Sequence, residues 1–301
     1  MTRITLLDGG LSREITRFGA ELTQPEWSAG ALMRTPDAIQ QAHQAFFDAG
    51  AEIATTATYA VVPFHIGQAR FDAQGAELAA LSGKLARTAA DEAHAKGQVA
   101  RVAGCLPPTC GSYLPEDFDL TKAEQILPVL VDNLDPHVDF WLAETMSCLA
   151  EMRAAVSAVQ GTGKAIWLAC SLRDDDMNAA PVLRSGETVE EAARLAADLG
   201  AEALLFNCSL PEVMENAVLT ARQTFADLNK SIPLGVYANG FVPNPREGDA
   251  NETISAIRGD LGPADYLRWA EKWVAAGATV IGGCCGIGSA HIAELKAHLC
   301  A

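Results

Sequence analysis

The stretch "DAGAEIATT", from Asp48 to Thr56, joins the end of a helical pattern to a short apolar run that favours a strand. Two later stretches share this plan: "DLGAEALLFN", from Asp198 to Asn207, and "AAGATVIGG", from Ala275 to Gly283. In each, a glycine fits the left-handed position that ends a helix. The helix before the first stretch has a candidate N-cap in Thr35, and Pro36 suits its first turn. The recurrence predicts a helix–glycine–strand unit that repeats along the chain.

Eight short apolar runs occur at the spacing that this unit sets. They are Ile4–Leu7, Ile53–Thr56, Val99–Ala103, Phe140–Ala143, Ala165–Ala169, Ala203–Phe206, Pro233–Val236 and Thr279–Ile281. Nearly continuous apolar character is typical of parallel strands that are covered on both faces. Helical patterns follow the runs, for example in Glu187–Leu199, Pro211–Leu228 and Pro263–Ala276. Eight such units predict an α/β fold of the (β/α)8 TIM-barrel type, as a single domain over residues 1–301. A doubly wound open sheet is the alternative, but no G-x-G-x-x-G follows the first run.

The chain is acidic, with 38 Asp and Glu residues against 22 Lys and Arg residues, and its formal net charge is −16. Such a surface repels phosphate backbones and anionic lipids, so we expect neither a nucleic-acid nor a membrane partner. No apolar run approaches the length of a membrane span, and the apolar start is too short for a signal peptide. We therefore expect a cytoplasmic protein, a monomer or a homodimer, that acts on small molecules.

Eight cysteines in a reducing compartment are expected to be free thiols, which points to metal binding or catalysis. Cys208 closes the sixth predicted strand, and Cys284 and Cys285 follow the eighth within "GGCCG". Three thiolates from nearby strand ends can bind Zn²⁺ and leave its fourth tetrahedral position open. Adjacent residues on a regular strand point to opposite faces, and the flanking glycines let the backbone bend so that both thiols converge. Buried structural cysteines and a vicinal disulfide are the alternatives.

Further polar residues stand at the predicted carboxyl ends of the strands, where barrel enzymes place their chemistry. They include Asp8, Gly9 and Gly10 after the first strand, Tyr59 after the second, Glu144 after the fourth, and Tyr237 and Asn239 after the seventh. An acid that closes an apolar run, as Glu144 does, is either buried against a partner or directed at a ligand. The segment "CLPPTCGSYLPEDFD", residues 105–119, is predicted to be a loop over the site, with Cys105 and Cys110 as loop thiols.

Several short blocks, in this order, resemble the homocysteine S-methyltransferase family. They are "LLDGG" at Leu6–Gly10, "PEWSA" at Pro25–Ala29, "AET" at Ala143–Thr145, "FNC" at Phe206–Cys208, "GVYANG" at Gly235–Gly240 and "GGCCG" at Gly282–Gly286. The blocks span essentially the whole chain. Asn-Cys followed later by GGCCG is the specific part of the pattern, because DGG alone is common.

The resemblance implies a (β/α)8 barrel in which Cys208, Cys284 and Cys285 hold one Zn²⁺ and homocysteine supplies the fourth ligand through its sulfur. It also implies that Asp8 and Glu144 hold the amino group of the substrate. Backbone N–H groups near Gly9 and Gly10 would then receive its carboxylate. A metal-bound thiol is a thiolate, the nucleophilic form, so the reaction needs no nucleophile from the enzyme.

The methyl donor is harder to predict than the acceptor. Many family members carry Gly-Pro in the loop after the third strand, where this chain has "GCLPPTCGSY", and Ile287 stands where Thr is common. No cobalamin or folate module follows the last barrel helix, so we expect a small onium donor: S-methylmethionine, S-adenosylmethionine or a betaine. Tyr59, Tyr237 and Asn239 are candidates for the donor side, because aromatic faces attract onium groups.

Two other functions remain as alternatives. One is a barrel methyltransferase or demethylase that acts on a different thiol. The other is a non-catalytic barrel that binds thiols or metal, against which Asp8 and Glu144 argue, because metal storage needs no site for an amino acid.

Overall fold

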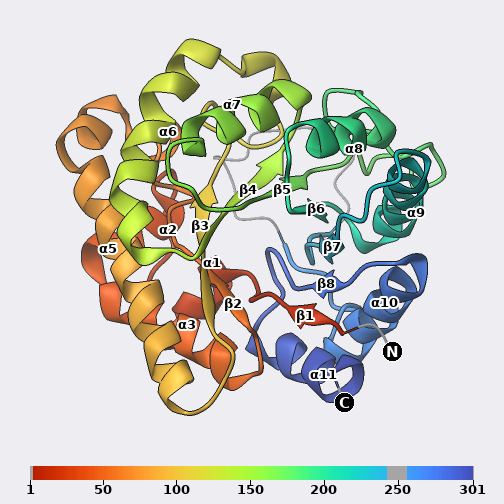
Figure 1. Ribbon diagram of the computed structural model, residues 1–301. Coiled ribbons are helices and arrows are strands. Elements are labelled where there is room, and N and C mark those ends of the chain that lie inside the picture. Colours follow the sequence, from red (N-terminus) through yellow and green to blue (C-terminus); the bar gives the residue numbers. More distant parts are fainter. Residues whose placement is uncertain (1–2, 243–255, 301) are drawn as a thin grey trace.

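The computed structural model describes residues 3–242 and 256–300, in which eight parallel strands form a nearly closed barrel (Figure 1). The strands are β1 (Thr5–Leu6), β2 (Ile53–Thr55), β3 (Arg101–Leu106), β4 (Phe140–Met146), β5 (Ile166–Cys170), β6 (Ala203–Asn207), β7 (Leu234–Tyr237) and β8 (Val280–Ile281). Neighbours pair in chain order from β2 to β8, and β8 pairs with β1. A parallel bridge between Leu7 and Ile53 joins β1 to β2. The predicted barrel is confirmed, and each predicted strand overlaps an observed one.

Helices surround the strands on the outside of the barrel (Figure 1). They are α1 (Leu11–Glu14), α2 (Trp27–Arg34), α3 (Pro36–Asp48), α4 (Pro63–Ile66), α5 (Gln68–Ala95), α6 (Leu120–Leu134), α7 (Leu149–Val159), α8 (Val189–Asp198), α9 (Pro211–Asp227), α10 (Pro263–Ala276) and α11 (Ser289–Leu299), with 3₁₀ turns at Ile15–Phe18, Pro115–Asp117 and Asp135–His137. In the part of the chain that the structure describes, no helix is both long and apolar enough to cross a membrane.

The glycines of the repeated unit end their helices as the sequence predicts. Gly50, Gly200 and Gly277 have φ values of +104°, +73° and +123°, a conformation that costs glycine little. The start of α3 differs from the prediction. Pro36 is its first residue, but the Thr35 side chain makes no capping hydrogen bond, and the Ala38 N–H donates to the Thr35 carbonyl oxygen instead.

Two apolar layers follow from the alternation of side chains along each strand. One layer lies between the strands and the helices, and the other fills the inside of the barrel. Every strand, or the residue next to it, contributes to the inner layer: Leu7, Ile53, Ala103, Phe140, Leu142, Trp167, Ala169, Ala203, Leu205, Tyr237 and Val280. The polar residues at the carboxyl ends of the strands therefore stand above a packed floor.

The barrel closes where the beginning and the end of the described chain meet. Thr5 and Leu6 pair in register with Val280 and Ile281. Outside this seam, the buried Glu14 carboxylate of α1 accepts hydrogen bonds from the backbone N–H of Ser289 at 3.2 Å and from its hydroxyl at 2.8 Å. This contact fastens α1 to the first turn of α11.

His43 of α3 gives the fold a testable dependence on pH. It is fully buried, neither ring nitrogen has a hydrogen-bond partner among the described residues, and burial lowers its pKa to about 4. The unfolded chain, with an ordinary histidine pKa near 6.5, binds this proton first, so stability is present above pH ~6.5 and falls towards pH ~4. We expect the free energy of unfolding of the parent to lose about 3 kcal/mol over this interval relative to His43→Leu. Urea unfolding of both proteins at several pH values measures the difference, and a constant difference would contradict the assignment.

Candidate metal centre and active site

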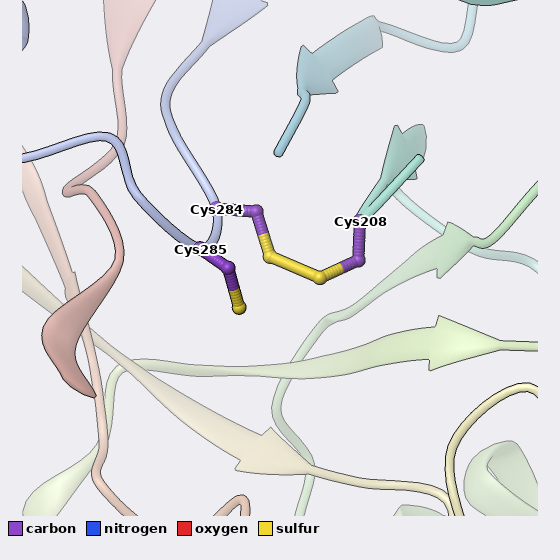
Figure 2. A group of neighbouring side chains, drawn as sticks. All are labelled: Cys208, Cys284 and Cys285. Carbon is purple, nitrogen blue, oxygen red and sulfur yellow. A yellow bond between two sulfur atoms is a disulfide. The ribbon is translucent and has the colours of Figure 1, made fainter. Parts of the chain in front are cut away.

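The three predicted metal-binding cysteines come together at the carboxyl ends of β6 and β8. Cys208 follows β6, Cys284 and Cys285 follow β8, and their three sulfur atoms lie within 4.8 Å of one another. Figure 2 shows that Cys208 and Cys284 are joined by a disulfide, with a Cα–Cα distance of 5.6 Å, while Cys285 is a free thiol beside them. The alternative of a vicinal disulfide between Cys284 and Cys285 is therefore not what this structure contains.

The backbone leaves strand geometry at the cysteines in two ways. Gly286 has φ +86°, which bends the chain directly after Cys285, and Cys208 itself has a positive φ of +49°. Gly283 is needed for a different reason, because a Cβ placed there would overlap the side chain of Ile287. The glycines thus allow Cys284 and Cys285 to face the same space, as the sequence predicts.

The turn after β1 packs directly against the cysteine loop. The Gly10 N–H donates to the Ile287 carbonyl oxygen at 2.8 Å, and the Gly283 N–H donates to the Asp8 carbonyl oxygen at 3.0 Å. A Cβ on Gly10 would lie 3.1 Å from the Cα of Cys285 and closer still to the Cys284 carbonyl group. The single hydrogen of the Gly10 N–H is donated to the cysteine loop, so it is not available to a substrate. The predicted contact of this turn with a substrate carboxylate therefore falls to the Gly9 N–H.

A buried tyrosine supports the same loop from the helix side. The Tyr266 hydroxyl of α10 donates to the Gly282 carbonyl oxygen at 2.7 Å and accepts from the Ala238 N–H at 3.1 Å. It therefore fixes the ends of β7 and β8 relative to each other. Sequence reasoning did not single out this residue, because a tyrosine on a helix pattern carries no signal for such a contact.

Asp8 lies beside the cysteine loop and is 5% exposed. It accepts hydrogen bonds from the Thr55 N–H at 2.7 Å and from the Thr55 hydroxyl at 3.1 Å. Burial raises the pKa of Asp8 to about 8; the Thr55 N–H opposes this rise, and the nearby Glu144 carboxylate adds to it. A cation placed between the two acids would lower both pKa values.

Glu144 turns into the barrel from β4, next to two neutral donors. The Cys105 thiol donates to its Oε1 at 3.0 Å, and the Tyr237 hydroxyl donates to its Oε2 at 3.4 Å. Burial raises the pKa of Glu144, while these two hydrogen bonds lower it. The hydrogen bonds that the structure describes to Asp8 and Glu144 thus come from uncharged groups.

Cys105 corrects one prediction. It was expected to be a loop thiol, but it lies in β3, fully buried, and its backbone N–H and carbonyl group bind the hydroxyls of Thr56 and Thr58. The predicted strand ended three residues early, at Ala103. Since Ala103 faces the inside of the barrel, the alternation of a longer strand also directs Cys105 inward, and this signal could have found it.

The candidate donor-side residues occupy different parts of the mouth. The Tyr59 hydroxyl lies 2.6 Å from the Ser112 hydroxyl, and its ring meets the edge of Trp27 at a centroid distance of 6.2 Å. Tyr237 belongs to the inner layer and contacts Glu144, as described above. Asn239 is buried and accepts from the Phe241 N–H at 3.2 Å. Their role in binding a donor stays a prediction.

The segment predicted to lie over the site contributes Ser112 and Tyr113. Tyr113 is a non-glycine residue with φ +66°, and the Arg184 guanidinium stands 4.8 Å from the centre of its ring. Arg184 is itself held by Asp174 at 2.6 Å. The β3–α6 and β5–α8 connections therefore meet beside the mouth of the barrel.

The donor set suits a thiophilic metal ion. Three sulfur ligands within 4.8 Å leave one position of a tetrahedral ion open, which is the pattern of catalytic rather than closed structural sites. Metal binding and the Cys208–Cys284 disulfide exclude each other, because the thiolate and not the disulfide is the ligand. The oxidised pair seen in Figure 2 must be reduced before all three cysteines can bind metal.

Comparison with known proteins agrees with this geometry. The sequence profile of the homocysteine S-methyltransferase family matches residues 5–299. The homocysteine S-methyltransferase of Escherichia coli (strain K12) is 31% identical, over 98% of this chain and 95% of its own length. The selenocysteine methyltransferase of Astragalus bisulcatus is 26% identical, over 94% of this chain and 88% of its own.

Solved structures of the homocysteine methyltransferase MmuM from Escherichia coli superpose on the chain. The metallated form has a TM-score of 0.79 at 27% sequence identity and covers 98% of this chain and 96% of its own. The oxidized form has a TM-score of 0.80, also at 27% identity, with 98% and 95% covered. The chain belongs to the homocysteine S-methyltransferase family and is an enzyme of this kind.

Gly10→Ala tests the contact between the two loops. Because the new Cβ meets backbone atoms of Cys284 and Cys285, the cysteine loop must move. We expect the reduced variant to bind Co²⁺ at least roughly tenfold more weakly than the parent, the size typical for lost support of metal ligands. The absorption of the cobalt–thiolate complex measures binding during a titration.

Gly240→Ala is the matched control for this experiment. Gly240 also borders the cysteine loop, and its N–H donates to the Cys285 carbonyl oxygen, but a Cβ there meets atoms only at 3.4 Å and beyond. The control should bind Co²⁺ with parental affinity. Parental affinity in Gly10→Ala as well would show that the close approach of the two loops is not required.

Proposed function

We propose that this enzyme transfers a methyl group from a small onium donor to the thiol of homocysteine and so forms methionine. The observation that carries the proposal is the pairing of two kinds of site at one barrel mouth. A group of three cysteine sulfurs stands next to two carboxylates, those of the buried Asp8 and the half-buried Glu144. A ligand that fits both is an amino acid whose side chain ends in sulfur.

The thiol end of the acceptor requires activation. An ordinary thiol with a pKa near 8.5 is mostly protonated at neutral pH. We propose that Cys208, Cys284 and Cys285 hold Zn²⁺, which when bound supplies the positive charge that keeps a substrate thiol ionised. The three protein sulfurs fix where that thiolate lies, and the apolar inner layer fills the barrel below them.

The amino end of the acceptor is proposed to bind between Asp8 and Glu144. Both carboxylates accept hydrogen bonds only from uncharged groups in the described structure, and Glu144 lies close enough to Asp8 to raise its pKa. An ammonium group between them would supply a positive charge and would lower the pKa of Asp8, which burial raises to about 8. Cys105, Tyr237 and Thr55 then orient the two carboxylates towards it.

The onium donor is proposed to approach from the side of Tyr59, with Tyr237 and Asn239 as further candidates for contact with it. Tyr59 stands in an aromatic group with Trp27 and His65, and aromatic faces attract sulfonium and quaternary ammonium cations. In-line attack by the thiolate on the methyl carbon forms the new S–C bond and releases the donor as a neutral thioether or amine. Positioning of the two reactants supplies most of the catalysis.

The remaining parts of the proposal concern the setting of the enzyme. We propose a cytoplasmic, single-domain protein, a monomer or a homodimer, that binds small molecules rather than nucleic acid or membranes. The barrel from Thr5 to Ile281 uses strands from the whole described chain, and the net charge of −16 disfavours anionic partners. Similarity to a selenocysteine methyltransferase makes a selenol acceptor the second candidate, because a selenol presents the same amino-acid group and a similar nucleophile.

A panel of donors and acceptors tests the proposed reaction. Reduced enzyme is loaded with Zn²⁺ and offered S-methylmethionine, S-adenosylmethionine, glycine betaine or methylfolate, with homocysteine or selenocysteine as acceptor. We expect about one Zn²⁺ per chain and methionine formed fastest from a sulfonium donor. Chromatography of the methylated product gives the rates. Cys208→Ser is the matched negative variant and should lose both metal and turnover, and turnover with methylfolate alone would overturn the donor assignment.

Glu144→Gln separates recognition of the amino group from activation of the thiol. The amide keeps the shape of the side chain but cannot pair with an ammonium, so the variant should retain its metal. We expect kcat/KM for homocysteine to fall by about 10–100-fold, the loss of one charge-assisted hydrogen bond. With 4-mercaptobutyrate, which lacks the amino group, parent and variant should differ much less.

Two results would contradict the assignment of Glu144. One is a parental kcat/KM for homocysteine, and the other is an equal loss with both acceptors, which would indicate a general structural role. Glu190→Gln removes an exposed carboxylate of the same type, which pairs with Arg194 on α8, and serves as the control.

A further inference from the structure

Asn207, the last residue of β6, binds one residue of another strand with both ends of its amide. Its Oδ1 accepts from the Thr145 N–H at 3.0 Å, and its Nδ2 donates to the Thr145 hydroxyl at 2.9 Å. Both residues are essentially inaccessible to solvent, with exposures of 0% and 1%. In the order of strands, β5 lies between β4 and β6, so the amide spans the carboxyl end of an intervening strand.

Thr145 needs such a partner because its backbone is in an unfavourable conformation. Its φ is +63°, in the left-handed region that β-branched residues rarely occupy. The register between β4 and β5 is interrupted between Ala143 and Met146, on either side of it. A non-glycine residue keeps such a conformation only where the surroundings fix it. The two hydrogen bonds with Asn207 fix its backbone N–H and its hydroxyl, and the Tyr59 side chain also contacts the Thr145 side chain.

The conformation of Thr145 bears directly on Glu144, the residue before it. Glu144 contacts Cys105 on β3 and Tyr237 on β7. Without the irregularity between Ala143 and Met146, the carboxyl end of β4 would continue in another direction and Glu144 would move with it. On the other side, Asn207 precedes Cys208, which also has a positive φ, and the Cys208 N–H donates to the Tyr237 carbonyl oxygen at 3.3 Å. One amide therefore connects the strand that carries the acid with the strand that carries the thiol.

We propose that Asn207 is a positioning residue, which holds Thr145 in its left-handed conformation and thereby sets Glu144 at the correct place relative to the cysteines. The inference rests on the proposed function, in which Glu144 binds the ammonium group of the acceptor. Asn207 touches no reacting atom; it acts through Thr145. Its loss should therefore weaken binding of acceptors that have an amino group more than it slows chemistry.

A double-mutant cycle tests this dependence on Thr145. Asn207→Ala should raise KM for homocysteine at least tenfold, with a smaller change in kcat and an unchanged metal content. Glycine adopts positive φ freely, so Thr145→Gly removes both the conformational problem and the hydroxyl partner. In that background, Asn207→Ala should change KM less than threefold. Multiplicative effects of the two substitutions would overturn the proposal, because they would mean that Asn207 acts independently of Thr145.

Two further measurements keep the outcome interpretable. With 4-mercaptobutyrate, Asn207→Ala should change KM little, and an equal loss with both acceptors would also overturn the proposal. If Asn207→Ala does not fold, as judged by circular dichroism, Thr145→Val takes its place, because it removes the hydroxyl partner of Asn207 and of Tyr59 but keeps the bond from the Thr145 N–H to Asn207. A KM below twice the parental value would then be the contrary result. Asn216→Ala, on the exposed side of α9, is the control. Failure of the parent to methylate homocysteine would refute the proposed function itself, which is a distinct outcome.

Discussion

The contact between the turn after β1 and the loop after β8 is the constraint on which both the barrel and the site depend. The two backbones approach so closely at Gly10 and Cys284 that no side chain fits between them, and two N–H···O bonds cross the gap. Strand pairing at the same seam closes the sheet. Closure of the barrel therefore fixes Cys284 and Cys285 relative to Asp8, so correct folding and a correctly shaped site are the same event.

The two carboxylates at the mouth of the barrel favour binding of a positively charged ligand. Asp8 and Glu144 share a buried space, and burial raises the pKa of each. Keeping two acids out of water costs free energy, and neutral donors such as Thr55 and Cys105 offset only part of that cost. A ligand with a positive charge stabilises such a site, so under the proposed function the acceptor would stabilise the folded protein as well as react in it.

The sequence allowed the barrel to be predicted because the relevant signals are local. Gly50, Gly200 and Gly277 end helices through their own backbone freedom, and short apolar runs identify strands covered on both faces. The three cysteines could be assigned together once their strands were placed in order. Features that depend on tertiary contacts could not be predicted in this way.

The missed features have identifiable causes. The direction of the Cys105 thiol depends on two further residues of β3, and the left-handed Thr145 depends on an amide that comes from β6. The packing role of Gly10 is visible only when the last loop is in place. The sequence also left open which cysteines pair on oxidation, and the structure joins Cys208 to Cys284 rather than the two neighbours.

The long separation of the cysteines along the chain has a consequence for biosynthesis. Cys208 and Cys284 are 76 residues apart. At ribosomal speeds of about 5–20 residues per second, Cys208 is made roughly 4–15 s before its companions. A nascent chain during that interval contains only one of the three cysteines of this site. Under the proposed function, metal loading would therefore follow synthesis of β8 and its pairing with β1.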